Sequence, residues 1–143
     1  MGEKALRIVV LPGDGIGAEV MDCALAVLEA AQHRVPSAAL DLVHMNAGAG
    51  TYLETGSALP GDVVAAIESA NGVLLGAMGL PNVRYPDGTE IIPQIELRMI
   101  FDLYAGVRPI RLLPGAPTPM GDTRARGMDF VIIRESTEGL FAH

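Results

Sequence analysis

The sequence has little of what disulfide-rich, membrane-spanning and nucleic-acid-binding proteins depend on. Its 143 residues include one cysteine, Cys23, and no tryptophan. A single cysteine excludes a disulfide framework and a CxxC metal site, and it fits a reducing cytoplasm. No stretch approaches the roughly 18 apolar residues of a membrane span, and the N-terminus shows no signal-peptide pattern. A formal net charge of −7, with no cluster of basic residues, argues against nucleic acid or an anionic membrane as partner.

The apolar content and the choice of basic residue are informative. Half of the residues are hydrophobic, and a chain of this length buries about two thirds of its unfolded surface. We therefore expect a globular protein with one substantial core. Nine of the ten basic residues are arginine. Because the planar guanidinium group binds carboxylates through two parallel hydrogen bonds, the arginines are candidate carboxylate ligands.

Strand-like and helix-like segments alternate along most of the chain. Nearly all-apolar strands are predicted at 7–11, 39–45 and 73–78, helices at 18–32 and 63–70, and a loop or short broken helix in NAGAGTYLETG. This alternation predicts an α/β fold, with a largely parallel sheet flanked by helices. The long Pro- and Gly-rich segment 79–93 follows a strand directly, at the place where open α/β sheets bind ligands.

The C-terminal part follows a different pattern. A helix is predicted over 94–104, followed by extended AGVRPIRLL, a surface loop or hairpin arm over 114–127, and a last buried strand in DFVIIRESTEG. This change predicts a domain boundary near residue 104. We expect residues 1–104 to belong to a first α/β domain and residues 105–143 to begin a second one.

The glycine-rich LPGDGIG, residues 11–17, follows a strand and precedes a helix. With Ala18 it satisfies GxGxxA, a pattern that presents backbone N–H groups and a helix N-terminus to a pyrophosphate. Asp14 opposes this interpretation, because its carboxylate lies between the glycines and would repel a phosphate. Our default for Asp14 is a solvated surface position or a pair with an arginine. A Rossmann nucleotide binder using GxGxxA stays open as an alternative to a plain bend.

Three arginines each interrupt an apolar segment: Arg98, Arg108 and Arg134. A buried cation without a partner is costly, so each requires an acid. One alternative is a local pair, such as Arg98 with Asp102 one helical turn later. The other is a shared anionic ligand, for which a small di- or tricarboxylate is the natural candidate.

Four ordered motifs, LPGDGIGAEV, GAMGLP, ELRMIFDLYAGVRP and DFVIIRESTEG, resemble the metal-dependent β-decarboxylating dehydrogenases. This family includes isopropylmalate, isocitrate, homoisocitrate and tartrate dehydrogenases. The resemblance spans nearly all 143 residues, but only the first part of the family's chain. It implies an isopropylmalate dehydrogenase-like fold, distinct from the Rossmann fold, in an incomplete two-domain architecture. Residues 1–104 would begin the large cofactor-binding domain, and residues 105–143 the substrate and dimerisation domain of a homodimer.

The same resemblance implies an activity: NAD-dependent oxidation of a 2-hydroxy di- or tricarboxylic acid, followed by decarboxylation. NADP is not excluded as the cofactor. Mg²⁺ or Mn²⁺ would polarise the substrate oxygens, with its aspartate ligands and the family's lysine beyond residue 143, so the chain alone is expected to be inactive. The resemblance assigns the substrate carboxylates to Arg98, Arg108 and Arg134. It assigns cofactor contacts to Gly79, Leu80, Pro81, Asn82 and Glu90, with Glu90 near the nicotinamide ribose.

One position departs from the family pattern. RExTxxxY ends here in Phe141, and phenylalanine cannot donate the proton that the family's tyrosine supplies. Phe141 marks either a subgroup that uses another acid or water, or a member with impaired decarboxylation. A further alternative is a non-catalytic paralogue that senses a carboxylate. The substrate also stays open, because EIIPQIELR combines isoleucines with the polar Gln94 and predicts a mixed pocket.

Overall fold

The chain divides into two compact units, Met1–Gln94 (unit 1) and Ile95–His143 (unit 2). The computed structural model describes residues 5–35, 37, 39–135 and 137–138. This division falls at the start of the helix that the sequence analysis placed at the end of a first domain. The domain boundary near residue 104 therefore stays a prediction, and each unit is described by itself.

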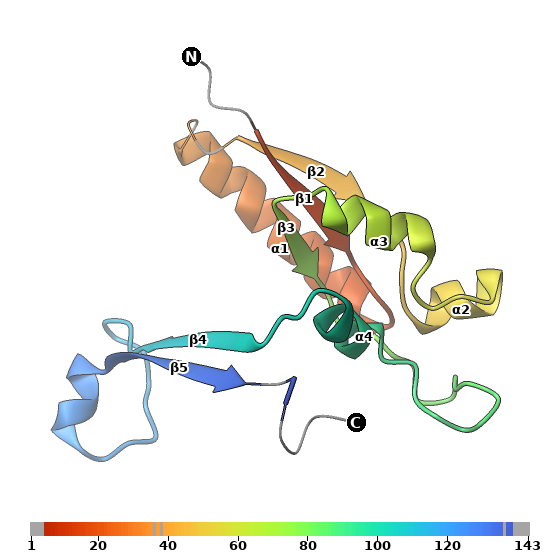
Figure 1. Cartoon of the computed structure of the whole chain (residues 1–143). Coiled ribbons are helices and arrows are strands. Elements are labelled where there is room, and N and C mark those ends of the chain that lie inside the picture. The colour runs from red at the N-terminus through yellow and green to blue at the C-terminus, as the bar shows by residue number, and fades with distance from the viewer. Residues whose placement is uncertain (1–4, 36, 38, 136, 139–143) are drawn as a thin grey trace. The chain divides into compact units, whose positions relative to one another are not determined.

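Unit 1 is built on a three-stranded parallel sheet in the order β2-β1-β3. The strands are β1 (Leu6–Leu11), β2 (Leu40–His44) and β3 (Gly72–Leu75). Helices α1 (Ile16–Arg34) and α3 (Gly61–Glu68) cross over between them and lie on opposite faces of the sheet (Figure 1). Opposite faces follow from two right-handed crossovers that run in opposite directions across the sheet, the first from β1 to β2 and the second from β2 past β1 to β3. The predicted parallel sheet flanked by helices is confirmed.

The core of unit 1 lies on its central strand. Val9, Val10 and Leu11 have no exposed surface, because β1 is paired on both edges and covered on both faces. Met21 from α1 and Val63 from α3 are buried as well. This packing positions the carboxyl end of β1, where the LPGDGIG loop begins.

A second, smaller cluster supports the segment that follows β3. Helix α2 (Ala49–Thr55) forms within the segment expected to be a loop or a short broken helix. Its Ala49 packs in a buried cluster with Ala58 and Ile91. Tyr52 meets Tyr85 edge to face, with ring centroids 5.2 Å apart. The chain after β3 is therefore anchored to α2 by side-chain packing.

Unit 2 contains helix α4 (Pro93–Ile100), which begins at the end of unit 1, and an antiparallel pair of strands. These are β4 (Ala105–Arg111) and β5 (Asp129–Glu135), joined by an arm that contains the 3-10 helix η1 (Thr123–Gly127). The helix ends before residue 104 because Asp102 adopts a φ of 48°, and the Leu103 N–H donates to the Arg98 carbonyl. The prediction that the last strand is buried is wrong, since every residue of β5 is exposed. Among the described strands, β4 is its only partner.

Candidate functional site

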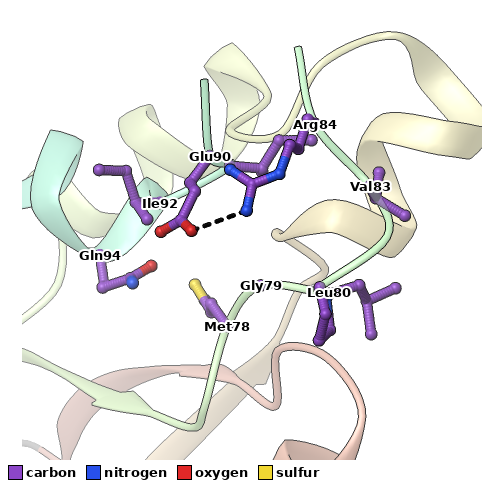
Figure 2. A pocket seen from close by; sticks show the side chains of 10 residues that line it. Met78, Gly79, Leu80, Val83, Arg84, Glu90, Ile92 and Gln94 are labelled. Carbon is purple, nitrogen blue, oxygen red and sulfur yellow. Dashed lines mark hydrogen bonds and ion pairs between the residues drawn. The ribbon is translucent and has the colours of Figure 1, made fainter. Parts of the chain in front are cut away.

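A pocket of about 330 Å³ lies in unit 1, beyond the carboxyl end of β3 (Figure 2). Its position agrees with the general rule that open parallel sheets bind ligands at this edge. All of its lining comes from the single segment after β3: Met78, Gly79, Leu80, Pro81, Val83, Arg84, Glu90, Ile91, Ile92 and Gln94. The sequence predicts a ligand at this segment.

A tight turn returns the chain to the pocket and places Glu90 there. Arg84 and Glu90 form an antiparallel bridge, the Tyr85 N–H donates to the Thr89 carbonyl at 3.0 Å, and Gly88 turns with a φ of 87°. The Arg84 guanidinium donates from Nη2 to Glu90 Oε1 at 3.0 Å. Both side chains are substantially exposed, so this pair orients Glu90 more than it stabilises the fold.

The tip of the turn is held by Asp87. Its Oδ1 accepts hydrogen bonds from the Thr89 hydroxyl at 2.6 Å and the Thr89 N–H at 2.9 Å. The hydroxyl bond is the larger reason that the pKa of Asp87 is lowered from its ordinary value. An ionised Asp87 therefore helps to define the loop that leads to Glu90.

Gln94 supplies a second polar group to the pocket. Its Oε1 is buried and, of the buried side-chain polar atoms in the described ranges, is the one without a hydrogen-bond partner. Figure 2 shows Gln94 and Glu90 on the same side of the pocket. An unsatisfied buried acceptor costs about 1–3 kcal/mol, so a ligand that brings an N–H or O–H donor would offset this cost.

The LPGDGIG loop is a packed bend that lies directly against the chain after β3. A Cβ on Gly13 would lie 2.0 Å from the Ala77 carbonyl oxygen, and one on Gly17 would lie 2.5 Å from it. The Asp14 N–H donates to Ala77 O and the Gly17 N–H donates to Asp14 O, both at 2.8 Å. The glycines therefore permit close approach to the chain after β3, and these two N–H groups already have acceptors.

The expectation that Asp14 is solvated or paired with an arginine is wrong. Only 8% of Asp14 is exposed, and its carboxylate accepts three backbone hydrogen bonds. Oδ2 accepts from the N–H groups of Ala49 and Gly79, both at 2.7 Å, and Oδ1 accepts from the Gly50 N–H at 2.8 Å. The signal in the sequence was the small-residue run NAGAG, whose bare backbone can approach a carboxylate closely.

Four of the five residues expected to contact the cofactor line the pocket: Gly79, Leu80, Pro81 and Glu90. Asn82 belongs to the same segment, but it is exposed and is not among the described lining residues. The structure thus brings most of the expected set together. Their role in cofactor binding stays a prediction.

The three arginines are exposed, so the premise that they are buried cations is wrong. Arg108 lies opposite Ile132, and Arg134 lies opposite Gly106. Because side chains alternate between the faces of a strand, Arg108 and Arg134 share one face of the hairpin, as diagonal neighbours about 7–8 Å apart.

Arg98 lies in the last turn of α4. Its expected pair with Asp102 is not formed, because the helix ends at Ile100 and Asp102 adopts the left-handed conformation. Within the part of the chain that the structure describes, the side chains of Arg98 and Arg108 have no hydrogen bond or ion pair. Both guanidinium groups can therefore bind an anionic ligand without first losing a partner.

A protein-family model matches the sequence along nearly the whole chain. The model for isocitrate/isopropylmalate dehydrogenase covers residues 7–143. The chain belongs to the isocitrate/isopropylmalate dehydrogenase family. It is 38% identical to a 3-isopropylmalate dehydrogenase of Methanothermobacter thermautotrophicus, over 96% of this chain. It is 33% identical to a tartrate dehydrogenase/decarboxylase of Pseudomonas putida, over 99% of this chain.

A solved family member has the same fold. The crystal structure of isocitrate dehydrogenase from Methylococcus capsulatus matches 96% of this chain with a TM-score of 0.72 at 28% identity. The chain spans only part of these family members: 36% of the 3-isopropylmalate dehydrogenase, 39% of the tartrate dehydrogenase/decarboxylase and 36% of the crystallised chain. The family and the fold are thereby established for the portion that this chain represents.

Two expectations for this family concern parts that the structure does not show. Phe141, at the family's tyrosine position, lies outside the described residues. Across the described ranges, no three His, Cys, Asp or Glu side chains are placed to hold a metal ion. None of the helices in these described ranges has both the length and the apolar content to cross a membrane.

Proposed function

We propose that the protein oxidises and decarboxylates a 2-hydroxy di- or tricarboxylic acid with NAD, and that this chain carries part of the active site. Family membership supports the reaction class, since related chains include the tartrate dehydrogenase/decarboxylase and a decarboxylating D-malate dehydrogenase. The observation that carries the proposal is the pocket beyond β3, where Glu90 and Gln94 lie together.

The cofactor end of the site is this pocket. NAD, when bound, supplies the hydride acceptor of the reaction. Glu90 has one carboxylate oxygen held by Arg84, and a carboxylate offers about four lone-pair sites. It therefore keeps acceptor capacity for the hydroxyl pair of a ribose. Gly79, Leu80 and Pro81 provide the adjoining wall, and Asn82 is the exposed member of the proposed cofactor contacts. NADP is the alternative cofactor.

The substrate end of the site uses the three arginines. Arg108 and Arg134 share one face of the hairpin, at about the spacing that suits two carboxylates of one small molecule. Arg98 adds a third guanidinium group, and each of the three can bind a carboxylate through two parallel hydrogen bonds. The mixed pocket around Gln94 does not single out one hydroxy acid.

Titration of NAD into the isotopically labelled chain tests the cofactor end. Amide resonances that shift on addition of NAD should concentrate in residues 78–94. Glu90→Gln should weaken binding roughly tenfold, because a charge-assisted acceptor is lost. Glu68→Gln, an exposed site on α3, is the matched control and should bind like the parent chain. Shifts that spare the pocket, or equal affinity in the two variants, would contradict the assignment.

Turnover tests the proposed incompleteness of the site. The chain mixed with NAD, Mg²⁺ and hydroxy acids such as isopropylmalate, isocitrate and tartrate should form no NADH. Sustained NADH formation by the chain alone would show that it carries the whole catalytic machinery. A homodimer and a reducing cytoplasmic setting belong to the same proposal and are accessible to sizing and to fractionation of cells.

The departure at Phe141 favours one second candidate, a carboxylate-sensing paralogue without catalysis. In the complete protein, a subgroup enzyme should be active with Phe141 in place. A sensor should be inert with Phe141, yet bind the hydroxy acid through the arginines. The discriminating measurement is activity before and after Phe141→Tyr, together with the affinity for the acid in both forms.

A further inference from the structure

The Asp14 carboxylate connects three segments that are distant in the sequence. It belongs to the LPGDGIG loop after β1, it accepts hydrogen bonds from Ala49 and Gly50 at the start of α2, and it accepts one from Gly79 in the pocket segment. Gly79 is a lining residue of the pocket, and Asp14 is not. The Asp14 carboxylate thus contacts a lining residue of the pocket without lining the pocket itself.

We propose that Asp14 is a positioning residue: its carboxylate sets the conformation of the Gly79 end of the pocket segment and so tunes the affinity of the site. The consequence for cofactor binding rests on the proposed function. The consequence for the shape of the pocket segment does not.

The conformation at Gly79 requires a restraint of this kind. Its φ of 106° belongs to a region that glycine can leave freely, because it has no Cβ to limit it. The Asp14 bond to its N–H, at 2.7 Å, fixes the direction of the peptide from which Leu80 and Pro81 continue. Charge-assisted hydrogen bonds are about twice as strong as neutral ones, so an ionised carboxylate suits this task.

The carboxylate itself has almost no freedom to move. Oδ2 is shared between Gly79 and Ala49, while Oδ1 is held by Gly50. On its remaining side, a Cβ built on Gly48 would lie 2.4 Å from Oδ2. A shift of Asp14 therefore moves Gly79 or leaves a buried N–H without an acceptor.

Asp14→Asn is the first test, because asparagine keeps the shape but has one acceptor oxygen where aspartate has two. At least one of the three N–H groups then faces an amide donor, and in either orientation of the amide the bond from the Gly79 N–H loses its charge assistance. In the labelled chain, we expect the amide resonances of Gly79 and Leu80 to move and their hydrogen exchange to accelerate about tenfold. NAD affinity should fall roughly tenfold.

Gly50→Ala, at a helical position of α2 where a Cβ would lie 3.3 Å from Asp14 Oδ1, tests the same contact from the other side and retains the Asp14 charge. Its Cβ should displace the carboxylate and shift the Gly79 resonance as Asp14→Asn does. This variant keeps the test available if Asp14→Asn folds poorly. Val63→Ala is the matched control: it creates a small cavity on α3, so it should lower the melting temperature but leave the Gly79 amide and the NAD affinity unchanged.

The outcomes separate the positioning role from the proposed function. Unchanged amides across 78–81 in both variants would overturn the inference, and so would unchanged NAD affinity despite a lost Gly79 hydrogen bond. If the parent chain binds no NAD, the proposed function fails, while altered pocket amides still support the positioning role. An equal loss of affinity in Val63→Ala would reduce Asp14 to a fold-stabilising residue and overturn the inference.

Discussion

The two units place similar apolar strands in opposite environments. In unit 1, Val9 and Val10 on β1 are fully buried, because two strands and two helices surround them. In unit 2, Ile132 and Ile133 on β5 are exposed, at 47% and 71%. An apolar run therefore predicts a strand in both units, but the number of neighbouring elements decides whether the strand forms a core. Unit 1 supplies a pocket, whereas unit 2 supplies arginines on an open face.

The largest expected difference between the units is in the free energy of unfolding lost when one glycine in each is replaced by alanine. Gly13→Ala should lower the free energy of unfolding by at least ~3 kcal/mol, because φ is 80° and the new Cβ would meet the Ala77 carbonyl. Gly127→Ala is the counterpart, since nothing lies within 4 Å of a Cβ there and φ is not positive. Its effect should stay within ~0.5 kcal/mol, as measured by urea denaturation. Similar losses at both glycines would contradict the close packing of the LPGDGIG loop.

Truncation of one strand residue in each unit probes the burial difference directly. Val9→Ala should cost about 2 kcal/mol, because it removes buried methyl groups and leaves a cavity. Ile133→Ala removes more atoms but should cost less than ~1 kcal/mol, since the side chain is already in water. Thermal unfolding of both variants gives the comparison. A reversed order would mean that β5 is covered in the protein in solution.

Surface ion pairs should contribute similarly little in the two units. Arg84 and Glu90 are 3.0 Å apart in unit 1, and Arg111 and Asp129 are 3.6 Å apart in unit 2. Double-mutant cycles should give coupling energies of about 0.2–1 kcal/mol for the first pair and less for the second, both reduced by salt. A coupling well above this range for Arg84 and Glu90 would show that the turn depends on the pair.

The smallest effect is a pH dependence at one turn in each unit. The pKa values of Asp87 and Asp122 lie below the ordinary value of 3.8, chiefly because of side-chain hydrogen bonds from Thr89 and Arg124 respectively. A lowered folded-state pKa stabilises the fold above the unfolded value, and this contribution is lost as the pH falls through the folded pKa. Carboxyl resonances followed by NMR should therefore titrate below pH 3.8 at both sites. Titration at or above that value would contradict the hydrogen-bonded turns.

Much of the fold was predictable because it is encoded by local periodicity. The strands at 7–11 and 39–45 form within a residue of their predicted bounds, and the helix after LPGDGIG forms with longer bounds. The helix predicted over 94–104 ends at Ile100, because the Asp102 backbone conformation closes it. Nothing in the apolar pattern around Asp102 indicates that conformation.

The candidate site was predictable in location but not in detail. Segment 79–93 was expected to bind a ligand because it follows a strand of a parallel sheet, and the pocket lies there. The polarity of Gln94 was visible in EIIPQIELR, but its unpartnered oxygen was not. The burial expected for Arg98, Arg108 and Arg134 was wrong, because an apolar neighbourhood in the sequence does not say how many elements cover it.

The amino-acid order by itself determined the alternation of strands and helices, the parallel sheet and the family, since these depend on periodicity and on motifs that neighbouring residues carry. Only the tertiary structure decided that Asp14 turns inward to Ala49 and Gly79, and that Arg108 and Arg134 share a face. The physical reason is distance along the chain. Hydrogen bonds across 35 and 65 residues depend on how packed elements meet, and no local pattern specifies that geometry.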